Sequence, residues 1–200
     1  MSARVGWRQA RVALAALGLG VGAWQLGSGA WIHAKALVAQ HLLRDAWSRA
    51  VAGAERPKPW PWADTYPVAR LRVPAHGIDR IVLGGASGES LAFGPAHLRV
   101  SAVPGSEGHV VIAGHRDTHF AFLQHLENGD ELILEPVDGP VRRYRVSKRQ
   151  VIDSRTTRLR LGQSRTVLSL VTCYPFDAVS PGGPQRFHVI GELVELGTEG

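Results

Sequence analysis

Three residues of this chain carry side chains that could perform acyl transfer, and each lies at the end of a predicted strand. The only cysteine, Cys173, ends the apolar run Thr166–Thr172 and precedes Tyr174-Pro175, where a strand stops. His115 follows a second apolar run, and Arg186 opens a third. A thiol nucleophile, a proton carrier and a charged donor for an oxyanion are the groups that a cysteine acyl-transfer enzyme requires.

Each of the three residues also has an ordinary structural interpretation. A lone cysteine at the end of an apolar strand is often an inert buried thiol. A single histidine is often structural, and an arginine at a strand start is often a surface ion-pair residue. The residues lie far apart in the sequence, so they meet only if the fold brings these strand ends together. A closed barrel does this, because adjacent strand ends meet at one mouth.

The segments after Pro67 predict an all-β domain. They are short, rich in Val, Ile and Leu, and separated by glycine and proline, with no βαβ rhythm, which favours a small closed barrel of about seven to eight strands. The predicted strands are Val68–Val73, Ile78–Leu83, His109–Ala113, Glu131–Glu135, Val141–Val151, Thr166–Thr172 and Phe187–Glu195. Two short helices are predicted at Leu91–Leu98 and His119–Leu126.

The first 32 residues predict an N-terminal membrane anchor. Arg4, Arg8 and Arg11 precede a stretch from Val12 to Ile32 that carries no charged residue. A spanning helix requires ~20 such residues. Positive charge before the stretch predicts a single pass with the N-terminus inside and the remainder in the periplasm. Cleavage as a signal peptide is the alternative, since Ser28-Gly29-Ala30 fits a small-x-small cleavage pattern.

A second segment, residues 33–62, separates the anchor from the domain. Apolar residues recur at helical spacing from His33 to Ala54, and Pro57, Pro59 and Pro61 then end the helix. We therefore expect an amphipathic helix with a stiff linker, followed by a catalytic barrel at residues 63–200.

The local sequences around the three residues resemble the sortase family. The segment Ala-Gly-His-Arg-Asp around His115 resembles the family's histidine motif, and Leu-Val-Thr-Cys resembles its cysteine motif. The arginine of the next strand, Arg186, and the upstream segment Leu91–His97 fit the same family. The resemblance covers roughly Pro67 to Val194. The N-terminal anchor, and a C-terminus without a sorting tail, are similar to the Gram-negative branch.

The resemblance implies a membrane-anchored cysteine transpeptidase that needs no cofactor. Cys173 would attack the threonine carbonyl of an LPXTG-like C-terminal signal in a protein substrate, forming a thioester that passes to an amine acceptor. His115 would exchange protons with the departing and incoming amines, and Arg186 would bind the substrate and stabilise the oxyanion. Thr172 would contribute a backbone or hydroxyl contact to the substrate beside the nucleophile.

Other functions remain open at this point. His115 and His119 have the spacing of zinc ligands, but the glutamate of His-Glu-x-x-His is absent, so we expect no metal. The net charge of +6 accompanies scattered arginines without a base-reading motif, so we expect no nucleic-acid partner. The competing hypotheses are another envelope cysteine peptidase, an L,D-transpeptidase, and a non-enzymatic anchored β-barrel binding module.

Overall fold

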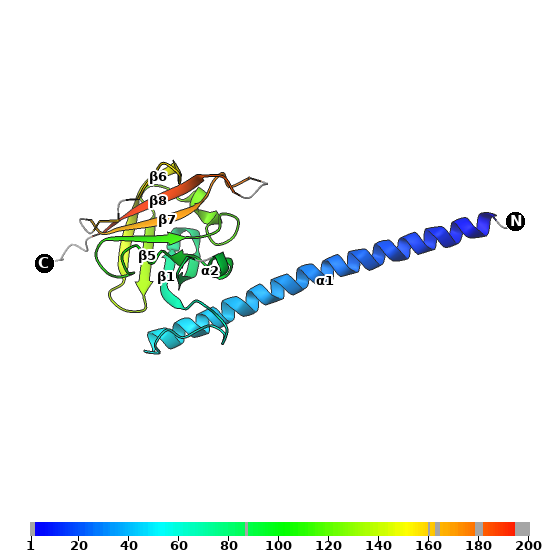
Figure 1. The fold of residues 1–200 in the computed structure, drawn as a ribbon, viewed down its shortest axis with the longest axis horizontal. Coiled ribbons are helices and arrows are strands. Elements are labelled where there is room, and N and C mark those ends of the chain that lie inside the picture. Colours follow the sequence, from blue (N-terminus) through cyan, green and yellow to red (C-terminus); the bar gives the residue numbers. More distant parts are fainter. Residues whose placement is uncertain (1–2, 87, 160, 163–164, 179–181, 195–200) are drawn as a thin grey trace. The chain divides into compact units, whose positions relative to one another are not determined.

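The computed structural model describes residues 3–194, except 87, 160, 163–164 and 179–181. Eight strands form a closed barrel in the order β1-β2-β3-β4-β7-β8-β6-β5, which Figure 1 shows as one rolled sheet. The predicted closed β-barrel is therefore confirmed. The strands are β1 (Pro67–Val73), β2 (Ile78–Gly84), β3 (Ala96–His97), β4 (His109–Ala113), β5 (Glu131–Pro136), β6 (Arg142–Asp153), β7 (Val167–Cys173) and β8 (Gln185–Leu193).

Among the described strands, six of the eight neighbouring pairs are antiparallel, and two are parallel, the short β2–β3 pair and the pair of β4 and β7. Their register aligns His109 with Val167 and Ala113 with Val171, so both strands end at the same rim of the barrel. β7 then pairs antiparallel with β8. This order places the ends of β4 and β7 and the start of β8 at one rim, as the barrel hypothesis required.

The predicted helices are present only in part. The segment predicted as Leu91–Leu98 overlaps the second half of the short helix α2 (Gly88–Phe93) and includes β3. The segment predicted as His119–Leu126 contains the 3₁₀ helix η2 (Ala121–His125). A second 3₁₀ turn, η1 (Pro74–His76), joins β1 to β2. The helix prediction was wrong at 96–97, because those two residues pair with β2 and β4 instead.

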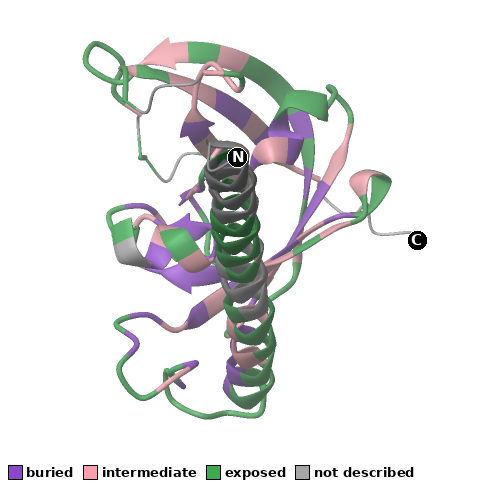
Figure 2. Cartoon of the chain, turned by 90° about the vertical axis from the view of Figure 1, so that its right-hand side faces the viewer, coloured by how far each residue is buried: buried purple, intermediate pink, exposed green. Residues whose placement is uncertain are grey.

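The barrel interior is a single apolar cluster, and Figure 2 shows buried residues, in purple, along strands of the barrel. It is built from alternate residues of the strands together with the aromatic residues that follow β4. Among its fully buried members are Leu71, Ile112, Phe120, Leu134, Tyr144, Leu168, Leu170 and Val189. Tyr144 is buried, and its hydroxyl has no hydrogen-bond partner among the described residues. This burial raises the pKa of Tyr144 to about 12.

The densest group of arginines lies on β6 and contacts the protein's own backbone and carboxylates. Arg143 forms an ion pair with Glu131 at 2.8 Å, and Arg142 donates to the Gly105 carbonyl. Arg149 donates to the Leu126 carbonyl. These three guanidinium groups therefore support the sheet and its loops.

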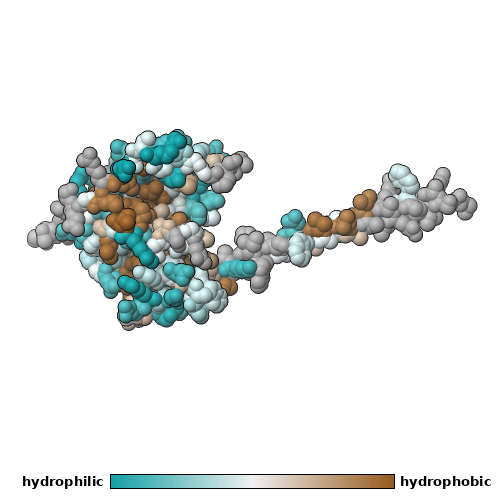
Figure 3. Space-filling view, in the orientation of Figure 1, coloured by the Kyte–Doolittle hydropathy of each residue, from teal (hydrophilic) through white to brown (hydrophobic). Residues whose placement is uncertain are grey.

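The N-terminal segment is one helix, α1 (Ala3–Val51), in place of two predicted segments. Leu14, Leu17, Leu19, Val21 and Trp24 each expose more than half of their surface, and Figure 3 shows apolar side chains along this part of α1. Among the described residues, none of the helices combines the length and hydropathy needed to cross a bilayer.

The last turns of α1 belong to the same compact unit as the barrel, which begins at Leu42. Leu43 is 1% exposed and packs with Ile81 and Leu83 of β2, with Trp47 and Phe93 at the edge of this cluster. We expected the domain to begin after the proline linker. The structure instead includes the end of the helix in the unit, because its apolar face covers β2.

Candidate active site

Cys173 and Arg186 are direct partners across the β7–β8 ladder. Cys173 is the last residue of β7 and Arg186 the second of β8, and the residues between them form the connecting loop. The main chain closes this end of the hairpin, because the Tyr174 N–H donates to the Gln185 carbonyl at 3.1 Å. The fold therefore places Cys173 and Arg186 opposite one another at the end of one hairpin.

The outward position of both side chains follows from the alternation of the strands. Leu168 and Leu170 point into the core, so Ser169 and Val171, which alternate with them, lie on the outer face with Cys173. Val189 is a core residue on β8, which places Arg186 on the outer face with Cys173. The cysteine is half-buried and free of any disulfide.

His115 follows β4 at the rim where Cys173 ends β7. The Gly114 N–H donates to the Val171 carbonyl at 3.1 Å, which continues the parallel ladder one residue beyond β4. The Thr172 hydroxyl donates to the Gly114 carbonyl at 2.7 Å. Gly114, which precedes His115, and Thr172, which precedes Cys173, are thus hydrogen-bonded across the β4–β7 pair. The His115 side chain is exposed.

A tight packing contact shapes the turn that carries His115. A Cβ at Gly114 would lie 2.7 Å from Phe120 Cγ, so only glycine fits against this fully buried ring. The Phe120 N–H donates to the His115 carbonyl at 2.9 Å. The histidine main chain is therefore held by the strand on one side and by a core aromatic residue on the other.

Arg186 uses one of its nitrogens to hold its own loop. Nη1 donates to the carbonyls of Gly183 and Gln185, both at 2.8 Å. Within the described part of the chain, Nε and Nη2 of Arg186 make no hydrogen bond. The guanidinium can therefore be positioned through Nη1 while two further donors serve a substrate oxygen.

Thr172 differs from the substrate-contacting residue that we expected. Its side chain is 2% exposed, and its hydroxyl is bonded to Gly114. The structure gives this side chain a role in joining β7 to the histidine turn. A substrate contact by the Thr172 backbone stays a prediction.

A line of polar side chains that the sequence did not reveal crosses the outer face of four strands. His109 Nε2 and Ser169 Oγ are 2.7 Å apart, Ser169 Oγ and His188 Nε2 are also 2.7 Å apart, and the Gln150 amide donates to His188 Nδ1 at 3.4 Å. Burial, with the charges of His109 and Lys148, lowers the pKa of His188 to about 4. The alternation of β8 placed His188 on the face of Arg186, but its partners depend on strand register.

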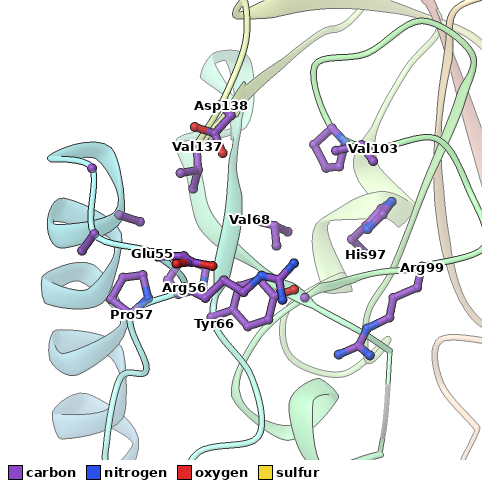
Figure 4. A pocket seen from close by; sticks show the side chains of 16 residues that line it. Glu55, Arg56, Pro57, Tyr66, Val68, His97, Arg99, Val103, Val137 and Asp138 are labelled. Atoms are coloured by element: carbon purple, nitrogen blue, oxygen red, sulfur yellow. The ribbon is translucent and has the colours of Figure 1, made fainter.

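A cavity of the described part of the chain lies away from these residues. It has a volume of about 770 Å³ and is lined by Arg56, Tyr66, Val68, His97 and Arg99, among others (Figure 4). The same cavity includes residues of the loop before β4, whereas His115 follows the end of β4. This cavity is therefore not where Cys173 and Arg186 would act.

The histidines outside the predicted site have separate environments. His119 is half-buried, and burial lowers its pKa, whereas His125 is exposed. Among the residues that the structure describes, no group of three or more His, Cys, Asp or Glu side chains could hold a metal ion.

Comparison with known proteins gives consistent matches. Residues 71–194 match the family described as "Sortase domain". Sortase D of Bacillus subtilis (strain 168) is 32% identical over 125 residues, which cover 62% of this chain and 62% of that protein. The matched part thus spans less than two thirds of the curated relative.

Solved structures share the fold at lower identity. Sortase A from Corynebacterium diphtheriae superposes with a TM-score of 0.60 at 23% identity, covering 81% of this chain and 86% of that chain. A Clostridium perfringens Sortase D5 transpeptidase gives a TM-score of 0.57 at 20% identity, covering 76% of this chain and 88% of that chain. With the family match over residues 71–194, these observations show that the chain belongs to the sortase family.

Proposed function

We propose that this chain is a cysteine transpeptidase that cleaves an LPXTG-like C-terminal signal and transfers the acyl group to an amine. The observation that carries the proposal is the pairing of Cys173 with Arg186 across β7–β8, with His115 at the same rim of β4. Membership of the sortase family supports the same reaction class.

The proposed reaction assigns one step to each side chain. The Cys173 thiolate attacks the threonine carbonyl carbon, and the negative charge that develops on the oxygen is stabilised by Arg186. His115 gives its proton to the departing amine as the C–N bond breaks, which leaves a thioester on Cys173. An incoming amine then attacks the thioester, His115 takes a proton from that amine, and the thiolate is released.

The direct test is incubation of the enzyme with an LPXTG-containing peptide and a glycine-peptide amine. We expect a covalent acyl-enzyme by intact-protein mass spectrometry and an amide product that contains the added amine. Cys173→Ala should form neither species while retaining its melting temperature. Transfer activity in a folded Cys173→Ala protein would contradict the mechanism. Hydrolysis alone at saturating amine would favour a cysteine peptidase instead.

The proposal extends to location. We propose that Met1–Ile32 anchors the chain in the inner membrane, with the N-terminus inside and the barrel in the periplasm. Support comes from the three arginines before an uncharged stretch, and from the exposed apolar side chains of α1. Membership of the Gram-negative branch stays a prediction that rests on the same segment.

Fractionation of cells that express the full chain tests the anchor. Full-length protein in the detergent-soluble membrane fraction supports it. A periplasmic protein shortened by about thirty residues would show that Ser28-Gly29-Ala30 is a cleavage site. Deletion of residues 1–32 should leave activity on short peptides and reduce activity on a membrane-retained substrate, because anchoring raises the effective concentration of the two partners.

A further inference from the structure

Arg116, the neighbour of His115, joins the turn that carries His115 to the loop between Cys173 and Arg186. Its Nη2 donates to the Ala178 carbonyl at 2.8 Å. Ala178 belongs to the loop between Cys173 and Arg186. The bond therefore spans 62 positions of sequence and connects the turn of His115 with the loop of the other two residues.

Both ends of this bond are held by the surrounding structure. On the histidine side, the Gly114 N–H is fixed to Val171, and the Phe120 N–H donates to the His115 carbonyl. On the other side, the Ala178 N–H donates to the Pro175 carbonyl at 3.4 Å, and Phe176 packs against the core. The hydrogen bond donated by Arg116 thus links the turn of His115 to the loop segment at Ala178.

The bond from Arg116 to Ala178 restrains the His115 turn in addition to the main-chain hydrogen bonds of that turn. The Gly114 and Phe120 bonds hold the main chain of the turn, while the His115 side chain is exposed. The next residue, Arg116, is half-buried, and its guanidinium reaches across to the β7–β8 loop. The orientation of the His115 turn relative to the β7–β8 loop therefore depends on the bond from Arg116 to Ala178.

We propose that Arg116 is a positioning residue for acyl transfer, which sets the distance between the His115 imidazole and the Cys173 thiol through its bond to Ala178. This inference rests on the roles proposed above for His115 and Cys173. Proton transfer requires hydrogen-bond reach, and a displacement of 1 Å can reduce turnover about 10²-fold. A rigid planar guanidinium fixes such a bond in a way that a flexible ammonium does not.

A purely electrostatic role for Arg116 predicts different results. A cation near Cys173 would favour the thiolate, and lysine would preserve that effect. The positioning role requires the bond to Ala178, so Arg116→Lys should lose most of what Arg116→Ala loses. The thiolate fraction, measured as the pH dependence of Cys173 alkylation by iodoacetamide, should not change in either variant.

The test compares Arg116→Ala and Arg116→Lys with a matched control, Arg165→Ala. Arg165 is an exposed arginine that forms an ion pair with Glu192. It precedes the start of β7 and so lies at the opposite rim of the barrel. Each substitution is made in the wild-type chain, and Arg116→Ala is also made in a His115→Ala chain. The measurements are kcat and KM for peptide transfer, the alkylation profile, and the melting temperature.

We expect both Arg116 variants to lower kcat by about 10- to 100-fold, with KM changed by less than about threefold. The melting temperature should change no more than in Arg165→Ala. In the His115→Ala chain, removal of Arg116 should cause no further loss, because the imidazole that it positions is absent.

Three results would overturn the inference. Wild-type turnover in Arg116→Lys would assign a charge effect, and a full additional loss in the His115→Ala chain would show that Arg116 does not act through His115. A loss that follows the melting temperature and disappears on cooling would make Arg116 a structural residue. Transfer by Cys173→Ala would instead contradict the proposed function itself, so the two failures are distinguishable.

Discussion

Arg186 lies directly opposite Cys173 in the β7–β8 ladder, and its Nη1 is bonded to the carbonyls of Gly183 and Gln185. The strand pairing fixes the main chains of the two residues, and the two carbonyls fix the guanidinium. Nε and Nη2 are then the donors available to a substrate oxygen. In the proposed mechanism, this single side chain would combine attachment to the loop with recognition of the substrate at the nucleophile.

Replacement of Arg186 by lysine should therefore fail although the charge is kept. An ammonium cannot bond both loop carbonyls and also present two parallel donors. We expect Arg186→Lys to lower kcat/KM roughly 10-fold or more, and Arg186→Ala roughly 10²- to 10³-fold, the range for loss of an oxyanion donor. Peptide-transfer kinetics measure both values.

The control for Arg186→Lys is Arg155→Lys, an exposed arginine that pairs with Asp153 two residues away. This control should retain wild-type kinetics. If Arg186→Lys also retains them, the guanidinium geometry is unimportant and Arg186 acts as a general positive charge.

The pairing of the His115 imidazole with the Cys173 thiol should make the reaction rate depend on pH on both an acidic and a basic limb. Transfer requires a thiolate together with an imidazolium, so kcat/KM should follow a bell-shaped profile. His115→Ala and His115→Gln should lower kcat roughly 10²- to 10⁴-fold, the usual contribution of a general acid–base group. Rates between about pH 5 and 10 bracket the ordinary pKa values of histidine and cysteine and give the profile.

His125→Ala is the matched control for His115, because His125 is exposed at the end of η2. It should keep both the rate and the profile. A flat wild-type profile, with acyl-enzyme formation shown to be rate-limiting, would contradict the role of His115.

The strands could be predicted from the sequence because their residues satisfy local rules. β4 was predicted as His109–Ala113 and has those bounds, and β7 differs by one residue at each end. β3 was missed because a two-residue strand has no pattern of its own. The packing of Leu43 on β2 was missed because the proline linker indicated a separate segment.

The candidate site divides in the same way. Cys173, His115 and Arg186 were found from motifs and strand ends, which are local signals. The bond from Arg116 to Ala178 and the line through Ser169 and His188 join distant segments. They depend on which strands are neighbours and in what register, which local patterns of residues do not reveal.

Gly114 should tolerate no larger residue. A Cβ there would approach the Phe120 ring to 2.7 Å, and a fully buried ring has little room to move. Gly114→Ala should destabilise the fold by about 1–3 kcal/mol, the usual cost of overpacking a core. It should also lower kcat, because the displaced Phe120 is bonded to the His115 carbonyl. Urea unfolding and transfer kinetics measure the two effects.

Gly162→Ala is the matched control for Gly114→Ala. Gly162 is exposed, and nothing lies within 4 Å of the added Cβ. The control should be neutral or slightly stabilising, since alanine restricts the unfolded chain. Equal stability of the Gly114→Ala protein would mean that the histidine turn and Phe120 move apart easily.

His188 should make the stability of the barrel depend on pH. Its pKa is about 4 in the folded protein, because burial and the charges of His109 and Lys148 disfavour the imidazolium. The ordinary value is about 6.5 in the unfolded chain. Between these two values the unfolded state binds more protons than the folded state, so the free energy of unfolding rises with pH across this window and is constant above it.

The expected loss from His188 on acidification from about pH 7 to pH 4 is about 3 kcal/mol. His188→Gln should remove this part of the pH dependence, since glutamine has no proton to gain, although it should lower stability at pH 7 by disturbing the bond to Ser169. Burial also lowers the pKa values of His97 and His119, so the wild-type slope includes them and the difference between the two proteins isolates His188. Urea unfolding at several pH values provides the comparison. Parallel pH curves for the two proteins would show that His188 binds protons equally in the folded and unfolded states.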